Sequence, residues 1–95
     1  MPVVTIVEGT VSPARAREFE AAYAALGPLP PGLLESRLIK NTAAQDLYRI
    51  ETVWESQEAL EKYRRTDKTP AAIALFQKMG ANPKVEIYDL CQSLH

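Results

Sequence analysis

The sequence predicts an α+β domain of the ferredoxin-like type: a four-stranded antiparallel sheet with helices on one face and the order β-α-β-β-α-α-β. Three observations predict it. Four segments have the β-branched or alternating composition of strands, three have helical apolar stripes behind a capping residue or proline, and they follow one another in that order. At 95 residues, the chain has the length of one domain, so residues 1–95 are expected to form a single domain.

The first strand and the first helix are predicted within residues 3–27. The run VVTIVEGTV at residues 3–11 is rich in β-branched residues and predicts a strand. Ser12 is suited to cap a helix over residues 13–26, which begins with a proline. Three residues at helical spacing give this helix an apolar face, namely Phe19, Tyr23 and Leu26. A glycine and a proline then end it.

The second and third strands are expected over residues 32–40 and 46–54. A proline-rich loop precedes them and NTAAQ separates them, so an antiparallel pair is the simplest arrangement. Alternation divides the third strand into two sets of side chains, with Tyr48, Ile50, Thr52 and Trp54 on one face and Leu47, Arg49, Glu51 and Val53 on the other.

Two helices and a strand complete the chain. Ser56 is expected to cap a helix over residues 57–65, and a threonine-proline pair starts another over residues 71–80. The run KVEIYDLC at residues 84–91 predicts the last strand.

Both faces of the predicted sheet carry apolar side chains, for example Val3 and Val7 on one face of the first strand and Val4 and Ile6 on the other. Helices cover one face, so we expect a second copy of the chain to cover the other, giving a homodimer closed sheet on sheet. The second face also holds two acids and two bases that either pair with one another or bind substrate: Glu35, Arg37, Arg49 and Glu51.

Composition and charge argue against several classes of partner. A net charge of -1 gives no basic excess for binding nucleic acid or an anionic membrane surface. No run approaches the ~20 apolar residues of a membrane helix, and the N-terminus has no secretory signal pattern. Cys91 is the only cysteine, which excludes an intrachain disulfide and favours a reducing compartment, so we expect a cytoplasmic protein with Cys91 as a buried small hydrophobe.

Several short motifs resemble the antibiotic-biosynthesis monooxygenase-like (ABM) domains of the dimeric α+β barrel group. The chain shares a first strand followed by an amphipathic helix, a PG pair at Pro31 and Gly32, and VWESQEAL at residues 53–60. LFQKMG and PKVEIYDL are similar to the last helix and strand of that family. The resemblance covers nearly the whole chain.

The resemblance implies a homodimer with a cavity between the sheet and helices of each subunit. Family members include cofactor-independent oxygenases of aromatic polyketides, haem-degrading enzymes and small-molecule isomerases. A first-strand asparagine and a third-strand tryptophan line the cavity in the oxygenase and haem-degrading members, and the latter add a helix histidine as iron ligand. Only the tryptophan carries over, as Trp54, because residues 3–11 contain no asparagine and the only histidine is His95.

Three residues are candidates for the chemistry. Trp54 either packs the third strand against the helices or edges a cavity and stacks a flat aromatic substrate. Tyr63 either lies at the edge of the core or uses its hydroxyl to hold or deprotonate a phenolic substrate. Glu8 interrupts an apolar strand; facing the cavity it would be a desolvated base, whereas a strand that opens near Gly9 would bring it to water.

The sequence contains no phosphate-binding glycine loop, metal-ligand cluster or serine triad pattern, so we expect no cofactor and no metal. The leading hypothesis is a cofactor-independent monooxygenase that acts on a small aromatic or quinol-like compound. The alternative is a non-catalytic dimeric domain that binds a small molecule or serves a housekeeping role.

Overall fold

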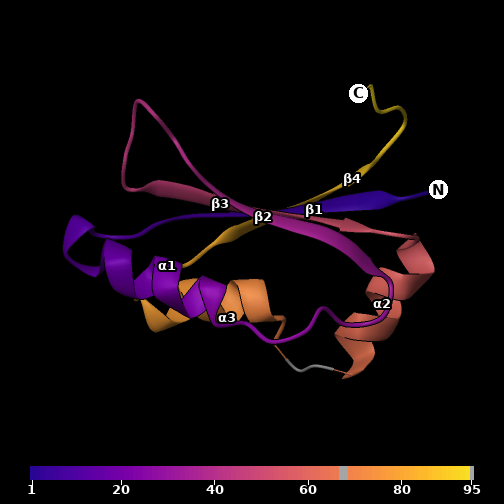
Figure 1. Cartoon of the computed structure of the whole chain (residues 1–95), viewed down its shortest axis with the longest axis horizontal. Helices are drawn as coiled ribbons and strands as arrows, with labels where there is room; N and C mark the ends of the chain where they lie inside the picture. Colours follow the sequence, from indigo (N-terminus) through magenta and orange to yellow (C-terminus); the bar gives the residue numbers. More distant parts are fainter. Residues whose placement is uncertain (67–68, 95) are drawn as a thin grey trace.

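The computed structural model describes residues 1–66 and 69–94 and confirms the α+β ferredoxin-like fold (Figure 1). The elements are β1 (Val3–Thr10), a 3₁₀ turn (Pro13–Arg15), α1 (Ala16–Ala24), β2 (Leu33–Lys40), β3 (Leu47–Trp54), α2 (Gln57–Thr66), α3 (Ala71–Lys78) and β4 (Lys84–Asp89). The histidine at position 95 lies outside the described residues.

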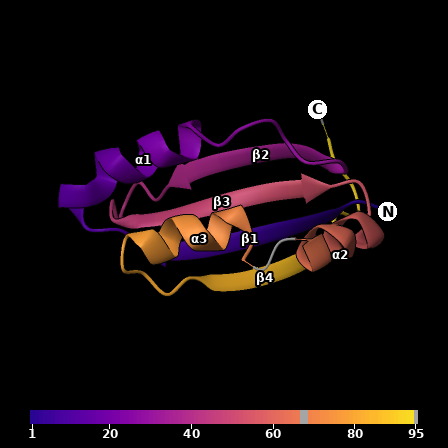
Figure 2. The same ribbon diagram turned by 90° about the horizontal axis from the view of Figure 1, so that it is seen from below.

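The sheet has the strand order β2-β3-β1-β4, and every neighbouring pair is antiparallel. All three helices lie on one face of the sheet, whereas the β2–β3 loop and the C-terminal segment extend to the other side (Figure 1). Seen from below, α1 runs beside β2, α3 crosses near β1 and β4, and α2 lies at the opposite end of the sheet (Figure 2). One sheet face is therefore covered and the other is open.

The main core is an aromatic cluster between the sheet and helices α1 and α3. Phe19 and Phe76 are fully buried, with ring centroids 4.8 Å apart, and Phe19 meets the Tyr48 ring edge-on at 5.0 Å. Gly9 makes room for this cluster, because a Cβ atom there would lie 2.8 Å from the ring of Phe76. The Tyr48 hydroxyl donates a 2.5 Å hydrogen bond to Glu20, and burial together with this bond raises the pKa of Tyr48 to about 12.

An irregularity at the start of β2 determines which of its side chains face the helices. The register with β3 shifts between Leu33 and Glu35, so that Leu33 and Ser36 both face the helices although their sequence positions differ by an odd number. Gly32 precedes this bulge with a φ of 87°, and a Cβ atom there would lie 2.6 Å from that of Ala59 in α2. Glycine therefore lets the chain enter β2 directly against α2.

The open face carries ion pairs around a smaller apolar area. Arg37 lies 3.2 Å from Glu51 and 3.7 Å from Glu35, so three of the four charges pair with one another, whereas Arg49 pairs with Glu8. Between them, β1 and β3 place half-buried apolar side chains on this face, namely Val4, Ile6, Leu47 and Val53. Such exposed ion pairs contribute little to stability. They therefore do not replace the stabilisation that burial of the apolar side chains on this face would give.

The ends of some elements differ from the prediction. The β4 strand stops at Asp89, and Cys91, which lies beyond it, is exposed rather than buried, so the prediction of a buried cysteine is wrong. Ser12 makes no side-chain cap, whereas Ser56 does, because its hydroxyl accepts the Ala59 backbone N–H at 3.0 Å. Over the two stretches that are described, no helix is long and apolar enough to cross a membrane.

Candidate functional site

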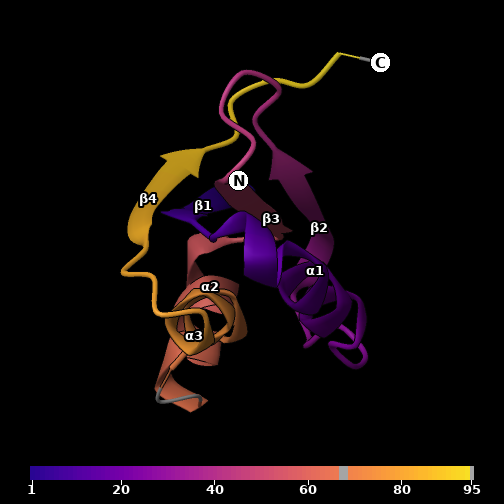
Figure 3. The same ribbon diagram turned by 90° about the vertical axis from the view of Figure 1, so that its left-hand side faces the viewer.

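A cavity of about 520 Å³ lies between the covered face of the sheet and the helices. Its floor is formed by strand residues, most of them from β1 and β3, and its walls by α2, the start of α3 and the loop that follows α1. Viewed along the sheet, α1 lies under one side of the sheet and α2 and α3 under the other (Figure 3). The volume falls within the range of small-molecule sites.

Trp54 and Tyr63 meet at one end of this cavity, and both line it. Their ring centroids are 5.0 Å apart at an interplanar angle of 39°. Trp54 is only 3% exposed and packs with Val3 and Leu60, so it both holds β3 against α2 and edges the cavity. Packing and edging the cavity are thus compatible for Trp54, and the stacking of a substrate stays a prediction.

The polar atoms of these two rings already have partners. The indole N–H of Trp54 donates to the hydroxyl of Thr5 at 3.3 Å. The hydroxyl of Tyr63 accepts the backbone N–H of Ala71 at 3.1 Å and so satisfies a donor at the start of α3. Tyr63 therefore supports the cavity wall as well as lining the cavity.

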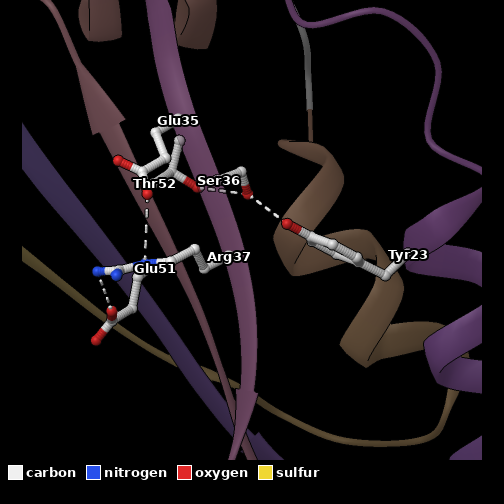
Figure 4. A network of polar contacts seen from close by, with 6 residues as sticks. All are labelled: Tyr23, Glu35, Ser36, Arg37, Glu51 and Thr52. Carbon is white, nitrogen blue, oxygen red and sulfur yellow. Dashed lines mark hydrogen bonds and ion pairs between the residues drawn. The ribbon is translucent and has the colours of Figure 1, made fainter.

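A row of hydroxyl groups crosses the cavity floor on three neighbouring strands. The strand registers place Ser36 beside Thr52, and Thr52 beside Thr5. The Tyr23 hydroxyl, from α1, donates to Ser36 at 2.8 Å, and the Ser36 oxygen lies 3.4 Å from that of Thr52 (Figure 4). We call Ser36, Thr52 and Thr5 the hydroxyl row; all three line the cavity.

The sequence analysis missed this row as a candidate site. The sequence nevertheless contains a pattern that indicates the row. Thr5 shares one strand face with Val3 and Val7, and Thr52 shares one with Ile50 and Trp54. A polar side chain at a helix-facing strand position is a buried polar group that needs a partner. The same view shows that Arg37 and Glu51, from the same strands, point away from the row to the open face (Figure 4).

The structure does not bring Glu8 to this cavity. Side chains alternate along β1, so Thr5 and Val7 face the helices and Glu8 faces the open side, where it contacts Arg49 at 2.6 Å. The hydrogen bond that Arg49 donates to Glu8, together with the negative charge of Glu8, raises the pKa of Arg49 above its ordinary value. A catalytic role for Glu8 stays a prediction, but the Glu8 side chain does not line the cavity beside Trp54.

The described lining of the cavity is largely apolar. Among the lining residues that the structure describes, Arg64 alone carries a formal charge, and the others are apolar or offer hydroxyl or indole groups. Hydroxyl, indole and guanidinium groups are not common metal ligands, so this donor set does not fit a metal centre. A ligand here would be recognised by shape, stacking and a few hydrogen bonds.

Comparison with known proteins places these features in context. The family model described as antibiotic biosynthesis monooxygenase matches residues 2–75. A search of curated proteins finds no match.

Solved structures share the fold over nearly the whole chain. A proposed antibiotic biosynthesis monooxygenase from Bordetella bronchiseptica has a TM-score of 0.77 at 21% identity, with 96% of this chain and 98% of that chain covered. One from Caulobacter crescentus has a TM-score of 0.70 at 27% identity and covers 95% and 91%. SnoaB, a cofactor-independent oxygenase from Streptomyces nogalater, has a TM-score of 0.69 at 21% identity and covers 98% and 96%.

Proposed function

Because the chain belongs to the antibiotic biosynthesis monooxygenase family, we propose that it is a cofactor-independent monooxygenase of a small aromatic or quinol-like compound, acting in the reducing cytoplasm. The observation that carries the proposal is the cavity beside Trp54, whose volume and apolar lining suit such a compound. Cofactor independence is taken from the likeness to SnoaB, which is described as a cofactor-independent oxygenase.

The proposed reaction is one in which the substrate itself supplies the electrons. A CH₂ group that is conjugated with a carbonyl group through an aromatic ring, as in an anthrone, loses a proton to water, and the remaining electron pair reduces dioxygen. Conversion of CH₂ and O₂ to C=O and H₂O transfers four electrons, so one oxygen atom enters the product, the other leaves as water, and no further reductant is needed. The protein would hold the substrate flat against Trp54 and exclude bulk water.

A non-catalytic binding domain is the second candidate. The observation that favours it is the described lining, which offers no carboxylate or imidazole to take a proton from the substrate. Both candidates use the same cavity and differ in whether dioxygen is consumed.

Oxygen uptake with a panel of anthrones and quinols separates the two candidates. We expect at least one member with such a CH₂ group to be consumed faster than in buffer alone, with one oxygen atom from labelled dioxygen in the product. A quinol without this group would instead be oxidised to a quinone with no oxygen atom incorporated. A panel that binds, as detected by quenching of the only tryptophan, but consumes no oxygen would favour the binding domain. Neither binding nor uptake would contradict both.

We also propose that two copies pack through their open sheet faces. Helices cover one face of the sheet (Figure 1). The other face carries half-buried apolar side chains of the central strands, including Val4, Ile6 and Val53. A second copy would bury this area and would surround it with the ion pairs of Arg37 and Arg49.

Replacing Ile6 with lysine is expected to convert a dimer into a monomer, because the substitution places a charge in the centre of the proposed interface. Sedimentation velocity at micromolar concentration checks this. Ala25→Lys, an exposed site on the helix side, is the matched control and should remain dimeric. A wild-type chain that sediments as a monomer would refute the proposed interface.

A further inference from the structure

The hydroxyl row has more protons to donate than the protein accepts. Tyr23, Ser36 and Thr52 carry three hydroxyl protons, and the two contacts between them use two. One proton therefore remains free on Ser36 or Thr52, whichever of the two does not donate to the other. For residues 1–66 and 69–94, no further hydrogen-bond acceptor contacts either hydroxyl.

Thr5 contributes a second free proton. An indole N–H can only donate, so Thr5 is the acceptor in its contact with Trp54. The Thr5 hydroxyl proton is left without an acceptor in the part of the chain that the structure describes. Thr5 and Thr52 are only 8% and 6% exposed, and both line the cavity, so their protons are directed into a confined space.

The donors at the two ends fix this arrangement. Tyr23 donates into the row from α1, and Trp54 donates into it from the end of β3. These two hydrogen bonds occupy acceptor lone pairs of Ser36 and Thr5. The hydroxyl protons of the row are therefore the groups left to bind a ligand. Thr5 and Thr52 are direct partners across β1 and β3, and the Cβ atoms of such partners lie roughly 4.5–5.5 Å apart. When Ser36 donates to Thr52, the free proton is on Thr52, and two donors at this separation are able to bind one oxygen atom.

We propose that Thr5 and the Ser36–Thr52 pair form a double-donor subsite for an oxygen atom that only accepts hydrogen bonds, such as the carbonyl or phenolate oxygen of an aromatic ligand. This inference rests on the proposed function, because it assumes that the ligand occupies the cavity beside Trp54. The subsite selects an aromatic ketone, quinone or phenolate over a hydrocarbon of the same shape. It also strengthens as negative charge develops on that oxygen.

A matched pair of probes tests the subsite without requiring turnover. Fluorenone and fluorene have the same tricyclic shape, but only fluorenone has a carbonyl oxygen. Equilibrium dialysis gives the ratio of their affinities, and the infrared carbonyl stretch of bound fluorenone reports its hydrogen bonds. We expect the wild type to prefer fluorenone and to lower its carbonyl frequency relative to an apolar solvent.

The variants remove the free protons one at a time. Thr5→Val removes one. Ser36→Ala and Thr52→Val together remove the other, since that proton resides on either oxygen, and Tyr23→Phe is added because the Tyr23 hydroxyl would otherwise lose its acceptor and become a new donor. Each change should reduce the fluorenone preference about fivefold, the value of one net hydrogen bond, with fluorene affinity unchanged. Thr10→Val, on the exposed end of β1, is the control and should keep the wild-type preference.

The outcomes separate the subsite from the cavity. If both probes bind the wild type equally, or if the preference survives the combined variant Thr5→Val, Tyr23→Phe, Ser36→Ala and Thr52→Val, the subsite is overturned and the cavity proposal stands. If neither probe binds, both fail. Circular dichroism and thermal melts of each variant show whether a lost preference comes from a lost fold.

Discussion

Replacing Phe19 with alanine is expected to lower the free energy of unfolding by about 3–5 kcal/mol, the usual cost of truncating a buried phenylalanine. Phe19 is fully buried and its ring contacts those of both Tyr48 and Phe76, so the vacated space is bounded by large rings that have little freedom to collapse into it. Domains of this size have total stabilities of about 5–15 kcal/mol. The variant should therefore be only marginally folded, as urea unfolding monitored by circular dichroism would show.

The comparison requires a fixed protein concentration, because a dimer is stabilised by mass action. Leu94→Ala is the control, since this leucine is 95% exposed and its truncation should change stability by less than about 0.5 kcal/mol. A loss below about 1 kcal/mol for the Phe19 variant would contradict the placement of this residue at the centre of the core.

Much of the fold follows from short-range patterns. Alternation in the first and third strands and the helical stripe containing Phe19 predict both the elements and the covered face, because each pattern extends over a few neighbouring residues. The contact between Gly9 and Phe76 does not follow from any such pattern. These residues are far apart in the sequence, and only the packing of α3 against β1 shows that the glycine is needed to make room for a ring.

Some residues of the candidate site can likewise be predicted from the sequence, and others cannot. The position of Trp54 in VWESQEAL gives its face of the sheet, and the next helix brings Tyr63 to the same end. The alternation of side chains along β1 likewise predicts that Glu8 and Thr5 lie on opposite faces of the sheet. The hydroxyl row depends on register between strands, and in β2 a bulge before Ser36 shifts that register. A bulge depends on local backbone geometry, so alternation alone does not reveal which hydroxyls become neighbours.

Replacing Trp54 with phenylalanine is expected to reduce kcat by roughly 100-fold for a substrate that the protein turns over, with a much smaller change in KM. Phenylalanine keeps an aromatic ring beside Tyr63 but removes the N–H that fixes Thr5 as an acceptor. The Thr5 hydroxyl is then free to rotate, and one of the two donors at the substrate oxygen is no longer held in place. Steady-state oxygen uptake, with a thermal melt to confirm folding, measures the effect.

A double-mutant cycle with Thr5→Val distinguishes positioning by Trp54 from direct stacking on the substrate. If Trp54 acts through Thr5, the double variant should be no slower than Thr5→Val alone, because the oriented donor is already absent. If the two losses multiply, Trp54 contributes independently of Thr5 and the positioning role is wrong. The pair is informative because the two residues are joined by a single buried hydrogen bond between β3 and β1, and valine preserves the shape of threonine without its hydroxyl.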